Sequence, residues 1–312
     1  MRIVVWLEHH ITAFRVQASQ LASLQSRHPA LDLRVVRSEA ELLGELAQAE
    51  AALVWSFSAE WYRLGPKLRF VATPAAGREK LEPDPSGRVR NVHGHFHGKI
   101  MAESLLAMML FFSRRLDAAV ADQTARRYER EPYSGTRRLA GQHALIVGFG
   151  PLGRECARLL KTLGLRVTGL RRSLQAEPAP ADAVFTVDQL HQLLPQADHV
   201  ILTLPSDTGT DHLIGARELS LMRSSATLYN LGRGNAVDEA ALLEALEAGE
   251  LAHAFLDVFE REPLPADSPL WHAKHLALLP HASAISSEYL DLWFEELETE
   301  LRALTARGRE SE

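Results

Sequence analysis

The chain has 312 residues, a formal net charge of -6 and 46% apolar residues. This length favours two domains with separate cores, and the composition is typical of a soluble globular protein. The negative charge argues against general binding to nucleic acid or anionic membranes, so we interpret the locally basic stretch 114–138 as a solvated or subunit-facing arm. No apolar run is long enough to span a bilayer. The single cysteine, Cys156, cannot form an internal disulfide, which favours the reducing cytoplasm.

In the first hundred residues, short apolar runs alternate with helix-like segments. Alternation of this kind predicts a parallel sheet with crossover helices. A polar, turn-rich stretch at 77–91 follows, and then one long apolar helix is expected over 100–127. The expected strands are 3–7, 31–36, 51–57 and 68–73, and the expected helices are 12–27 and 39–50.

The same alternation resumes at residue 144 and continues to the end of the chain. The expected helices include 238–247, which has an acidic first turn, and an amphipathic segment at 284–307. Two half-chains with this pattern predict an α/β fold of two doubly wound parallel-sheet domains. The expected strands are 144–149, 165–170, 199–205, 227–232, 252–259 and 276–281.

Polar or glycine residues stand after each expected strand of the second half. In doubly wound sheets, ligands bind at the carboxyl ends of the strands. These strand ends therefore predict a ligand site in the second half of the chain. The residues at the ends are Gly148 to Gly153, Arg171 to Ser173, Pro205 with Ser206, Gly232 with Arg233, Asp257, and His281.

The first of these ends, VGFGPLG, carries a GxGxxG pattern made by Gly148, Gly150 and Gly153. The pattern alone is weak evidence for nucleotide binding, but an apolar strand precedes it and Pro151 suits the first position of a helix. Glycines let the backbone turn tightly and approach a pyrophosphate, whose charge the free amides of the helix N-terminus can meet. The site is therefore predicted to bind a dinucleotide, with a plain strand-to-helix turn as the alternative.

The second strand end of this half reads Arg171-Arg172-Ser173, where NAD-binding sites usually place an acidic residue. Arginine cannot accept hydrogen bonds from ribose hydroxyls, but two guanidinium groups can hold a 2'-phosphate, to which serine can donate. The sequence therefore predicts that NADPH is preferred over NADH. The alternative is a pair of solvated arginines on a surface loop.

Three residues further along could carry chemistry: Arg233, Glu262 and His281. Hydride delivery to a 2-keto acid needs a cation to bind the carboxylate and polarise the carbonyl, and a proton donor for the developing alkoxide. Arg233 can be the cation and His281 the donor, with Glu262 stabilising the imidazolium. Taken singly, each has a structural alternative: a structural histidine, a solvated glutamate, and an arginine that binds a backbone carbonyl.

The motifs GFGPLG, LPSDTGTDHLI, NLGRGNAVDEAAL, LDVFEREPLP and PHASAIS occur in this order between residues 100 and 287. In this order they resemble the D-2-hydroxyacid dehydrogenase family. The resemblance implies a Rossmann nucleotide-binding domain at 99–282. It also implies a discontinuous, flavodoxin-like substrate domain at 1–98 and 283–312. The substrate is then expected between the two domains.

The resemblance also implies roles for individual residues. The family's catalytic arginine, glutamate and histidine correspond to Arg233, Glu262 and His281, and its nicotinamide-amide ligand corresponds to Asp257. The backbone of Pro151 would contact the pyrophosphate together with that of Leu152. The adenosine and nicotinamide sides would be lined by Leu204, Pro205, Ser206, Leu231 and Gly232.

The first hundred residues depart from the family pattern. The family's substrate loop often reads GxGxD, whereas here the counterpart is Ala75-Ala76-Gly77-Arg78 without the acid. Backbone amides of Ala76 and Gly77 are still expected to bind the substrate carboxylate, while the contacts of the substrate's far end are left open. His93, His95 and His97 alternate and could bind zinc, but the interrupting glycines favour a hinge or substrate-wall role, so no metal is expected.

The sequence therefore predicts an NADPH-preferring reductase that converts small 2-keto acids such as glyoxylate or hydroxypyruvate to D-2-hydroxy acids. The alternatives are a dehydrogenase of phosphoglycerate or another D-2-hydroxy acid, and a dinucleotide-sensing protein of the corepressor kind. The stretch 112–139 resembles the family's dimer-forming region, so a homodimer is expected. Binding to nucleic acid or membrane is not expected.

Overall fold

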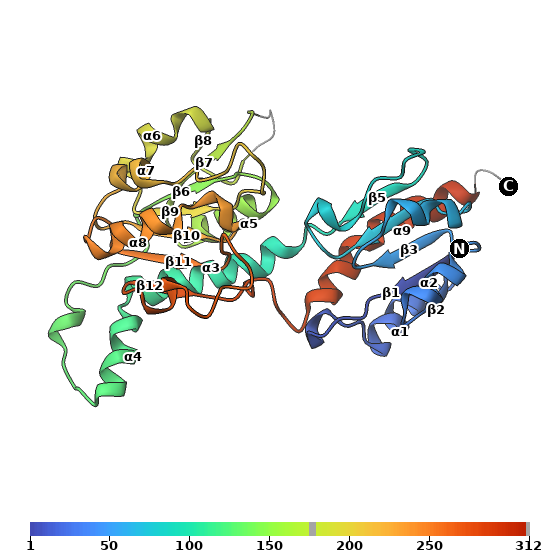
Figure 1. Cartoon of the computed structure of the whole chain (residues 1–312), viewed down its shortest axis with the longest axis horizontal. Helices are drawn as coiled ribbons and strands as arrows, with labels where there is room; N and C mark the ends of the chain where they lie inside the picture. The colour runs from blue at the N-terminus through green and yellow to red at the C-terminus, as the bar shows by residue number, and fades with distance from the viewer. Residues whose placement is uncertain (175–178, 310–312) are drawn as a thin grey trace. The chain divides into compact units, whose positions relative to one another are not determined.

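The computed structural model describes residues 1–174 and 179–309 and divides the chain into two compact units. The first unit consists of Met1–His97 together with the chain from Ile285 onward, and the second is Gly98–Ala284. Each unit contains one parallel sheet with its own buried core (Figure 1). None of the described helices is both long and apolar enough to cross a membrane.

The first unit is built on a five-stranded parallel sheet with the order β2-β1-β3-β4-β5. The register aligns Val4 with Ala52 and Leu53 with Ala72, so the strands end at one common edge. Helices α1 and α9 contact each other, and α9 runs along the sheet (Figure 1). The elements are β1 (Arg2–Trp6), α1 (Ala18–Arg27), β2 (Asp32–Val35), α2 (Glu39–Glu45), β3 (Ala51–Val54), β4 (Phe70–Thr73), β5 (Arg90–His93) and α9 (Tyr289–Arg309), with short 3-10 helices at Thr12–Phe14, Ala59–Leu64 and Arg78–Lys80.

The second unit is built on a seven-stranded parallel sheet with the order β12-β11-β10-β9-β6-β7-β8. The direction of strand progression reverses between β6 and β9, which is where dinucleotides bind in sheets of this kind. Its strands are β6 (His143–Val147), β7 (Arg166–Arg171), β8 (Ala183–Thr186), β9 (His199–Leu202), β10 (Thr227–Asn230), β11 (His253–Leu256) and β12 (Leu276–Leu278). Its α-helices are α3 (His97–Ser113), α4 (Leu116–Ala125), α5 (Pro151–Thr162), α6 (Leu190–Leu193), α7 (Ala216–Leu221) and α8 (Glu239–Glu247).

Helices cover both faces of the seven-stranded sheet. One buried cluster joins alternate strand residues to α6, α7 and α8, and the other joins the opposite set to α3 and α5. Burial on both faces explains why the strands read as nearly continuous apolar runs. Two parallel α/β sheets with covered faces confirm the predicted fold class.

The expected elements differ from the structure in four places. The helix expected over 12–27 is a 3-10 helix at Thr12–Phe14 followed by α1, which begins only at Ala18. Strands β5 and β8 were not anticipated, because RNVH is polar and AVFT is short and only partly buried. The single long helix expected over 100–127 is wrong: it is two helices, α3 and α4. The break is at Arg115, which has φ of +55° and so cannot continue a right-handed helix. In Figure 1, α4 projects away from the sheet of its unit.

The seven-stranded sheet contains a buried histidine, His199, which is the first residue of β9 and is 4% exposed. Its Nδ1 lies 3.1 Å from the Tyr229 hydroxyl and its Nε2 lies 2.8 Å from Oε1 of Gln142. Burial lowers the pKa of His199 from 6.5 to about 4. The folded protein therefore keeps this ring neutral at pH values where an unfolded chain would already protonate it.

We expect this histidine to make the fold sensitive to acid. Between pH 6.5 and about 4 the unfolded chain takes up a proton at His199 that the folded chain does not. The free energy of unfolding therefore falls as the pH falls, by up to about 1.4 kcal/mol per pH unit from this residue. His199→Gln should be less stable at neutral pH but should show a shallower decline in acid. Urea unfolding between pH 7 and pH 5 measures the free energy of unfolding of both proteins. If this free energy fell with pH as steeply in His199→Gln as in the wild type, the expectation would be wrong.

Candidate active site

The strand ends of the seven-stranded sheet bring the predicted residues of the second half of the chain to one edge. Because all seven strands are parallel, the segments that follow them leave from the same side of the sheet. Gly148 follows β6, Arg171 is the last residue of β7, and Asp257 follows β11. The other predicted residues on these segments are Leu204, Pro205 and Ser206 after β9, Leu231, Gly232 and Arg233 after β10, Glu262 after β11, and His281 after β12.

The glycine turn after β6 leaves room for a ligand. Gly148 has φ of +101°, and a Cβ there would lie 2.8 Å from the carbonyl of Thr203. A Cβ on Gly153 would lie 2.7 Å from the Gly148 oxygen, so both positions need glycine. A Cβ on Gly150 would instead meet nothing within 4 Å. This open position faces the start of α5, where Pro151 occupies the first turn and the free amides of the helix can bind a pyrophosphate.

The loops after β9 and β10 pack against this turn. Thr203 Oγ1 donates a hydrogen bond of 2.6 Å to the Gly148 carbonyl. A Cβ on Gly232 would lie 2.6 Å from the Leu204 amide nitrogen, so the two loops approach each other backbone to backbone. Leu231 is buried, whereas Pro205 and Ser206 are exposed. The site therefore has a backbone-lined wall on which a dinucleotide can lie.

The segment after β7 carries two arginines. Arg171 is half-buried, and Arg172 and Ser173 are exposed. Arg172 Nη2 lies 2.5 Å from Oδ2 of Asp207, in the loop after β9. The pair is largely exposed, so it adds little stability, but it directs the guanidinium towards the cofactor wall.

The Arg233 loop is held by its own backbone and by Asn230. Asn230 is fully buried at the end of β10; its Nδ2 donates to the Arg233 carbonyl at 3.0 Å and its Oδ1 accepts from the Gly232 amide at 3.1 Å. A Cβ on Gly234 would lie 1.9 Å from the Phe259 carbonyl, so this position admits only glycine. The half-buried Arg233 thus lies in a backbone segment that packs on the loop leading to Glu262, and its Nη1 donates to the Gly232 carbonyl at 2.9 Å.

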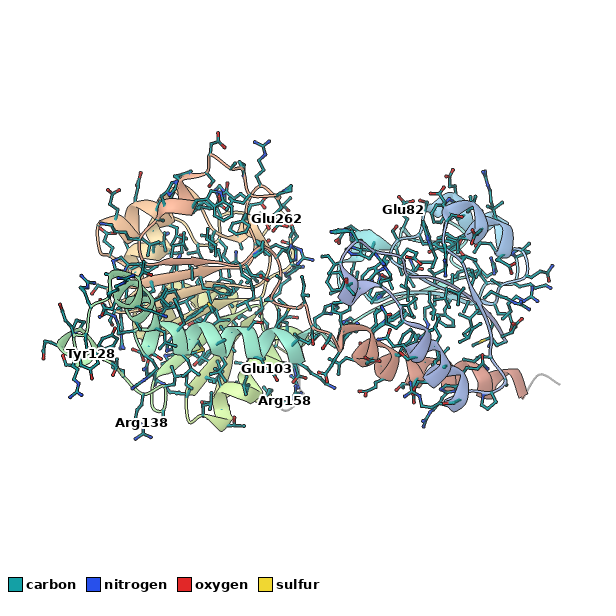
Figure 2. The ribbon with its side chains drawn as sticks, turned by 90° about the horizontal axis from the view of Figure 1, so that it is seen from below. Glu82, Glu103, Tyr128, Arg138, Arg158 and Glu262 are labelled. Atoms are coloured by element: carbon teal, nitrogen blue, oxygen red, sulfur yellow. The ribbon has the colours of Figure 1, made fainter. Side chains whose placement is uncertain are left out.

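Glu262 and His281 form a hydrogen-bonded pair. Nδ1 of His281 lies 2.8 Å from Oε2 of Glu262, although 19 residues separate them in the chain. The other carboxylate oxygen of Glu262 accepts from the Phe259 amide at 3.1 Å, which holds the side chain in place. Figure 2 shows Glu262 on its loop at the periphery of the second unit. Because Glu262 binds Nδ1, the opposite nitrogen, Nε2, is left for a substrate.

The backbone of His281 is fixed by the segment around Asp257. The His281 amide donates to the Asp257 carbonyl at 2.8 Å, and His281 has φ of +50°. The Asp257 carboxylate is fully buried; its Oδ1 accepts from the amides of Ala282 and Ser283, and its Oδ2 accepts from the Ser283 hydroxyl. Burial raises the pKa of Asp257, and the hydrogen bonds from Ser283 and Ala282 oppose that rise. In the structure this carboxylate thus positions the histidine segment.

Residues 75–78 lie in the first unit, after β4. The Ala75 carbonyl accepts from the Gly94 amide at 3.2 Å. Within residues 1–174 and 179–309, the amides of Ala76 and Gly77 donate no hydrogen bond. The Glu79 carboxylate lies beside Gly77, because a Cβ on Gly77 would be 2.1 Å from its Oε1.

The three alternating histidines do not share one environment. His93 ends β5, His95 is exposed, and His97 begins α3 with its Nε2 2.8 Å from the Tyr289 hydroxyl. Over the part of the chain that is described, no three histidine, cysteine or acidic side chains form a group that could hold a metal ion.

Comparison with known proteins identifies the family of this chain. A family model described as "D-isomer specific 2-hydroxyacid dehydrogenase, NAD binding domain" matches residues 106–283, more than half of the chain. The chain belongs to the D-2-hydroxyacid dehydrogenase family. The resemblance noted in the sequence is thus confirmed, and this dehydrogenase is an NAD(P)-dependent oxidoreductase.

Three relatives of this dehydrogenase support the same conclusion. The glyoxylate/hydroxypyruvate reductase B of Enterobacter sp. (strain 638) is 31% identical over 291 residues, which are 90% of this chain and 85% of that protein. A crystal structure of a D-isomer specific 2-hydroxyacid dehydrogenase family protein from Aeromonas salmonicida matches with a TM-score of 0.79 and 31% identity, over 98% of this chain and 96% of that one. The crystal structure of the D-isomer specific 2-hydroxyacid dehydrogenase from Xanthobacter autotrophicus Py2, in complex with NADPH and MES, matches with a TM-score of 0.75 and 28% identity. The match covers 92% of this chain and 90% of that one.

As a member of this family, the dehydrogenase uses a nicotinamide cofactor and acts on small 2-keto acids. Sequence reasoning did not anticipate three residues that build the site: Thr203, Asn230 and Ser283. Two of them stand directly after a strand or at its end, so their position could have indicated them. Ser283 had no such signal, because its contact with Asp257 joins residues 26 positions apart.

Proposed function

We propose that this dehydrogenase reduces small 2-keto acids of the glyoxylate and hydroxypyruvate type to D-2-hydroxy acids, with NADPH as the preferred cofactor. The observation that carries the proposal is the 2.8 Å pair between His281 Nδ1 and Glu262 Oε2 at the ligand edge of the sheet. Such a pair holds an imidazole so that its second nitrogen can give a proton to substrate. The curated relative named glyoxylate/hydroxypyruvate reductase B supports the substrate class.

Three side chains have separate roles in the proposed reaction. Arg233 binds the substrate carboxylate and polarises the keto group, because its guanidinium offers two parallel donors to a carboxylate. Bound nicotinamide supplies the hydride. His281 donates the proton from Nε2 to the developing alkoxide, and Glu262 stabilises the imidazolium before the transfer. Ala76 and Gly77 are proposed as further carboxylate donors, because their amides donate no hydrogen bond to any residue that the structure describes.

The residues that would hold the cofactor follow from the same strand ends. Gly150, where a Cβ would meet nothing within 4 Å, is proposed to leave space for the pyrophosphate, while Gly148 and Gly153 allow the tight turn. The amides at the start of α5, including that of Leu152, are proposed to bind it. The loop residues Leu204, Pro205, Ser206, Leu231 and Gly232 are proposed to line the adenosine and nicotinamide. Asp257 is proposed to accept a hydrogen bond from the nicotinamide amide, in addition to its contacts with Ser283.

The test of the function is consumption of NADPH with a panel of 2-keto acids by the purified full-length protein. Glyoxylate and hydroxypyruvate should be reduced fastest, and a chiral assay should find the D-hydroxy acid. Binding of NADPH without turnover of any keto acid would favour a dinucleotide-sensing protein. Faster turnover of phosphohydroxypyruvate would favour a phosphoglycerate dehydrogenase.

A homodimer formed through the α4 arm is also proposed. Val120 on α4 is 56% exposed and Tyr128, beyond its end, is 87% exposed. Exposed apolar side chains on a projecting arm are typical of a subunit interface. Light scattering should give twice the mass of the chain, and the double variant Val120→Glu, Tyr128→Glu should give a monomer. A monomeric wild-type protein at micromolar concentration would contradict the proposal.

A further inference from the structure

Two glutamates outside the proposed catalytic set bind each other's backbone amides. The Glu239 amide donates to Oε1 of Glu260 at 3.1 Å, and the Glu260 amide donates to Oε1 of Glu239 at 2.8 Å. Glu239 is the first residue of α8, and Glu260 lies on the loop that follows β11. These reciprocal bonds therefore join two segments that are 21 residues apart in the chain.

The loop that Glu239 holds is the one that carries Glu262. Oε1 of Glu262 accepts from the Phe259 amide at 3.1 Å, so Glu260 lies within the turn that this bond closes. Oε2 of Glu262 in turn lies 2.8 Å from Nδ1 of His281. A displacement of the backbone at Glu260 would therefore move the Glu262 carboxylate relative to the imidazole.

The other side of the reciprocal bonds belongs to the segment that carries Arg233. This segment runs from Arg233 through a 3-10 helix at Gly234–Ala236 to the start of α8. A Cβ on Gly234 would lie 1.9 Å from the Phe259 carbonyl and 2.5 Å from the Glu260 amide nitrogen. The two segments are thus in contact at both ends, by close backbone packing at Gly234 and by hydrogen bonds at Glu239.

The loop after β9 is bonded to both of these segments. Nε2 of His212 lies 3.1 Å from Oε1 of Glu260, and the His212 amide donates to the Asn235 carbonyl at 2.7 Å. The Ile214 amide also donates to the Ala236 carbonyl at 3.0 Å. Three loops at the ligand edge of the sheet are therefore cross-linked around Glu260.

The two reciprocal bonds have different consequences. The bond from the Glu239 amide to Glu260 satisfies a free amide of α8, as Asp238 does for the Ala241 amide at 3.0 Å. The positive end of the helix also makes two neighbouring carboxylates tolerable. The bond from the Glu260 amide to Glu239 contributes nothing to the capping of α8, because its donor belongs to the loop. Its effect is to fix the backbone of the loop.

We propose that Glu239 is a positioning residue whose carboxylate holds the Glu260 amide and thereby keeps Glu262 within bonding distance of His281. The inference rests on the proposed function, because it takes Glu262 and His281 to serve the transfer of the proton. Glu239 acts only through the loop and is not proposed to touch the substrate or the cofactor.

The test compares three substitutions of Glu239 in the full-length protein, with hydroxypyruvate as substrate. Glu239→Ala removes the acceptor and should lower kcat about tenfold, since a small misplacement of a catalytic group is costly. Glu239→Gln keeps an oxygen that can accept, and its kcat should stay within about twofold of the wild type. Glu239→Asp keeps the charge at the start of α8 but is one methylene shorter, so kcat should fall as in Glu239→Ala.

Two further measurements separate positioning from a general loss of structure. The KM for hydroxypyruvate should stay within about twofold in all three variants, because Asn230 holds the Arg233 carbonyl independently of Glu239. Glu244→Ala is the matched control, since Glu244 is an exposed glutamate of the same helix and its loss should leave kcat unchanged. A purely structural role would lower the free energy of unfolding in urea but leave kcat of the folded enzyme unchanged.

Combination with Glu262→Gln decides whether Glu239 acts through Glu262. If it does, Glu239→Ala should lower kcat much less in the Glu262→Gln protein than in the wild type. If both effects added in full, or if Glu239→Ala and Glu239→Asp kept the wild-type kcat, the positioning role would be wrong and the proposed function would stand. If the wild-type protein reduced no 2-keto acid, the proposed function would be wrong, and the positioning role with it.

Discussion

His281→Asn is expected to lower kcat for the reduction of hydroxypyruvate by about 10²- to 10⁴-fold, the usual contribution of a positioned proton donor. Asparagine is chosen because position 281 has φ of +50°, a conformation that asparagine tolerates better than most residues. The backbone bonds of this segment to Asp257 should therefore survive the change. Steady-state NADPH consumption measures kcat, and calorimetric titration with NADPH should give a Kd close to that of the wild type.

Two further variants make this prediction specific. Glu262→Gln keeps a side chain that can bind Nδ1 of His281 but removes the charge that stabilises the imidazolium, so kcat should fall less than in His281→Asn. His272→Asn is the matched control. His272 is the exposed last residue of the 3-10 helix Pro269–His272, between β11 and β12, so this variant should leave kcat unchanged. If His281→Asn retained the wild-type kcat, the proton would have to come from another group.

The double variant Arg171→Ala, Arg172→Ala should reverse the choice of cofactor. Each charge-assisted contact to a phosphate contributes about 1.5–3 kcal/mol, so losing both should lower kcat/KM for NADPH by about 10²-fold or more. The value for NADH should change little, because its ribose carries no phosphate. The Arg172 ion pair with Asp207 is 81% exposed on the arginine side, so the folded state should not depend on it.

Arg166→Ala provides the matched control for the cofactor experiment. Arg166 begins β7, at the opposite end of the strand from Arg171, and is exposed. The substitution Arg166→Ala removes one positive charge from the same strand and leaves the ligand edge of the sheet unchanged. The NADPH and NADH values of this variant should equal those of the wild type. Equal use of both cofactors by the wild-type protein would show that Arg171 and Arg172 are only solvated.

The order of elements and the ligand edge could be read from the sequence because both depend on local patterns. Strands buried on both faces must be apolar throughout, and β6 and β9 follow that rule. The turn at Gly148 is equally local, since its φ of +101° and its close contacts demand glycine. Strand β5 escaped prediction because RNVH is polar, and the break at Arg115 escaped because no proline or glycine marks it.

Sequence alone thus determined the fold class, the glycine turn and the identity of Arg233, Glu262 and His281 as candidates. Only the tertiary structure decided that Glu262 binds Nδ1 of His281 and that Asn230 holds the Arg233 carbonyl. The physical reason is that burial patterns and turn preferences depend on neighbours along the chain. Hydrogen bonds between loops depend instead on which strands lie side by side, and that order is set when the whole sheet assembles.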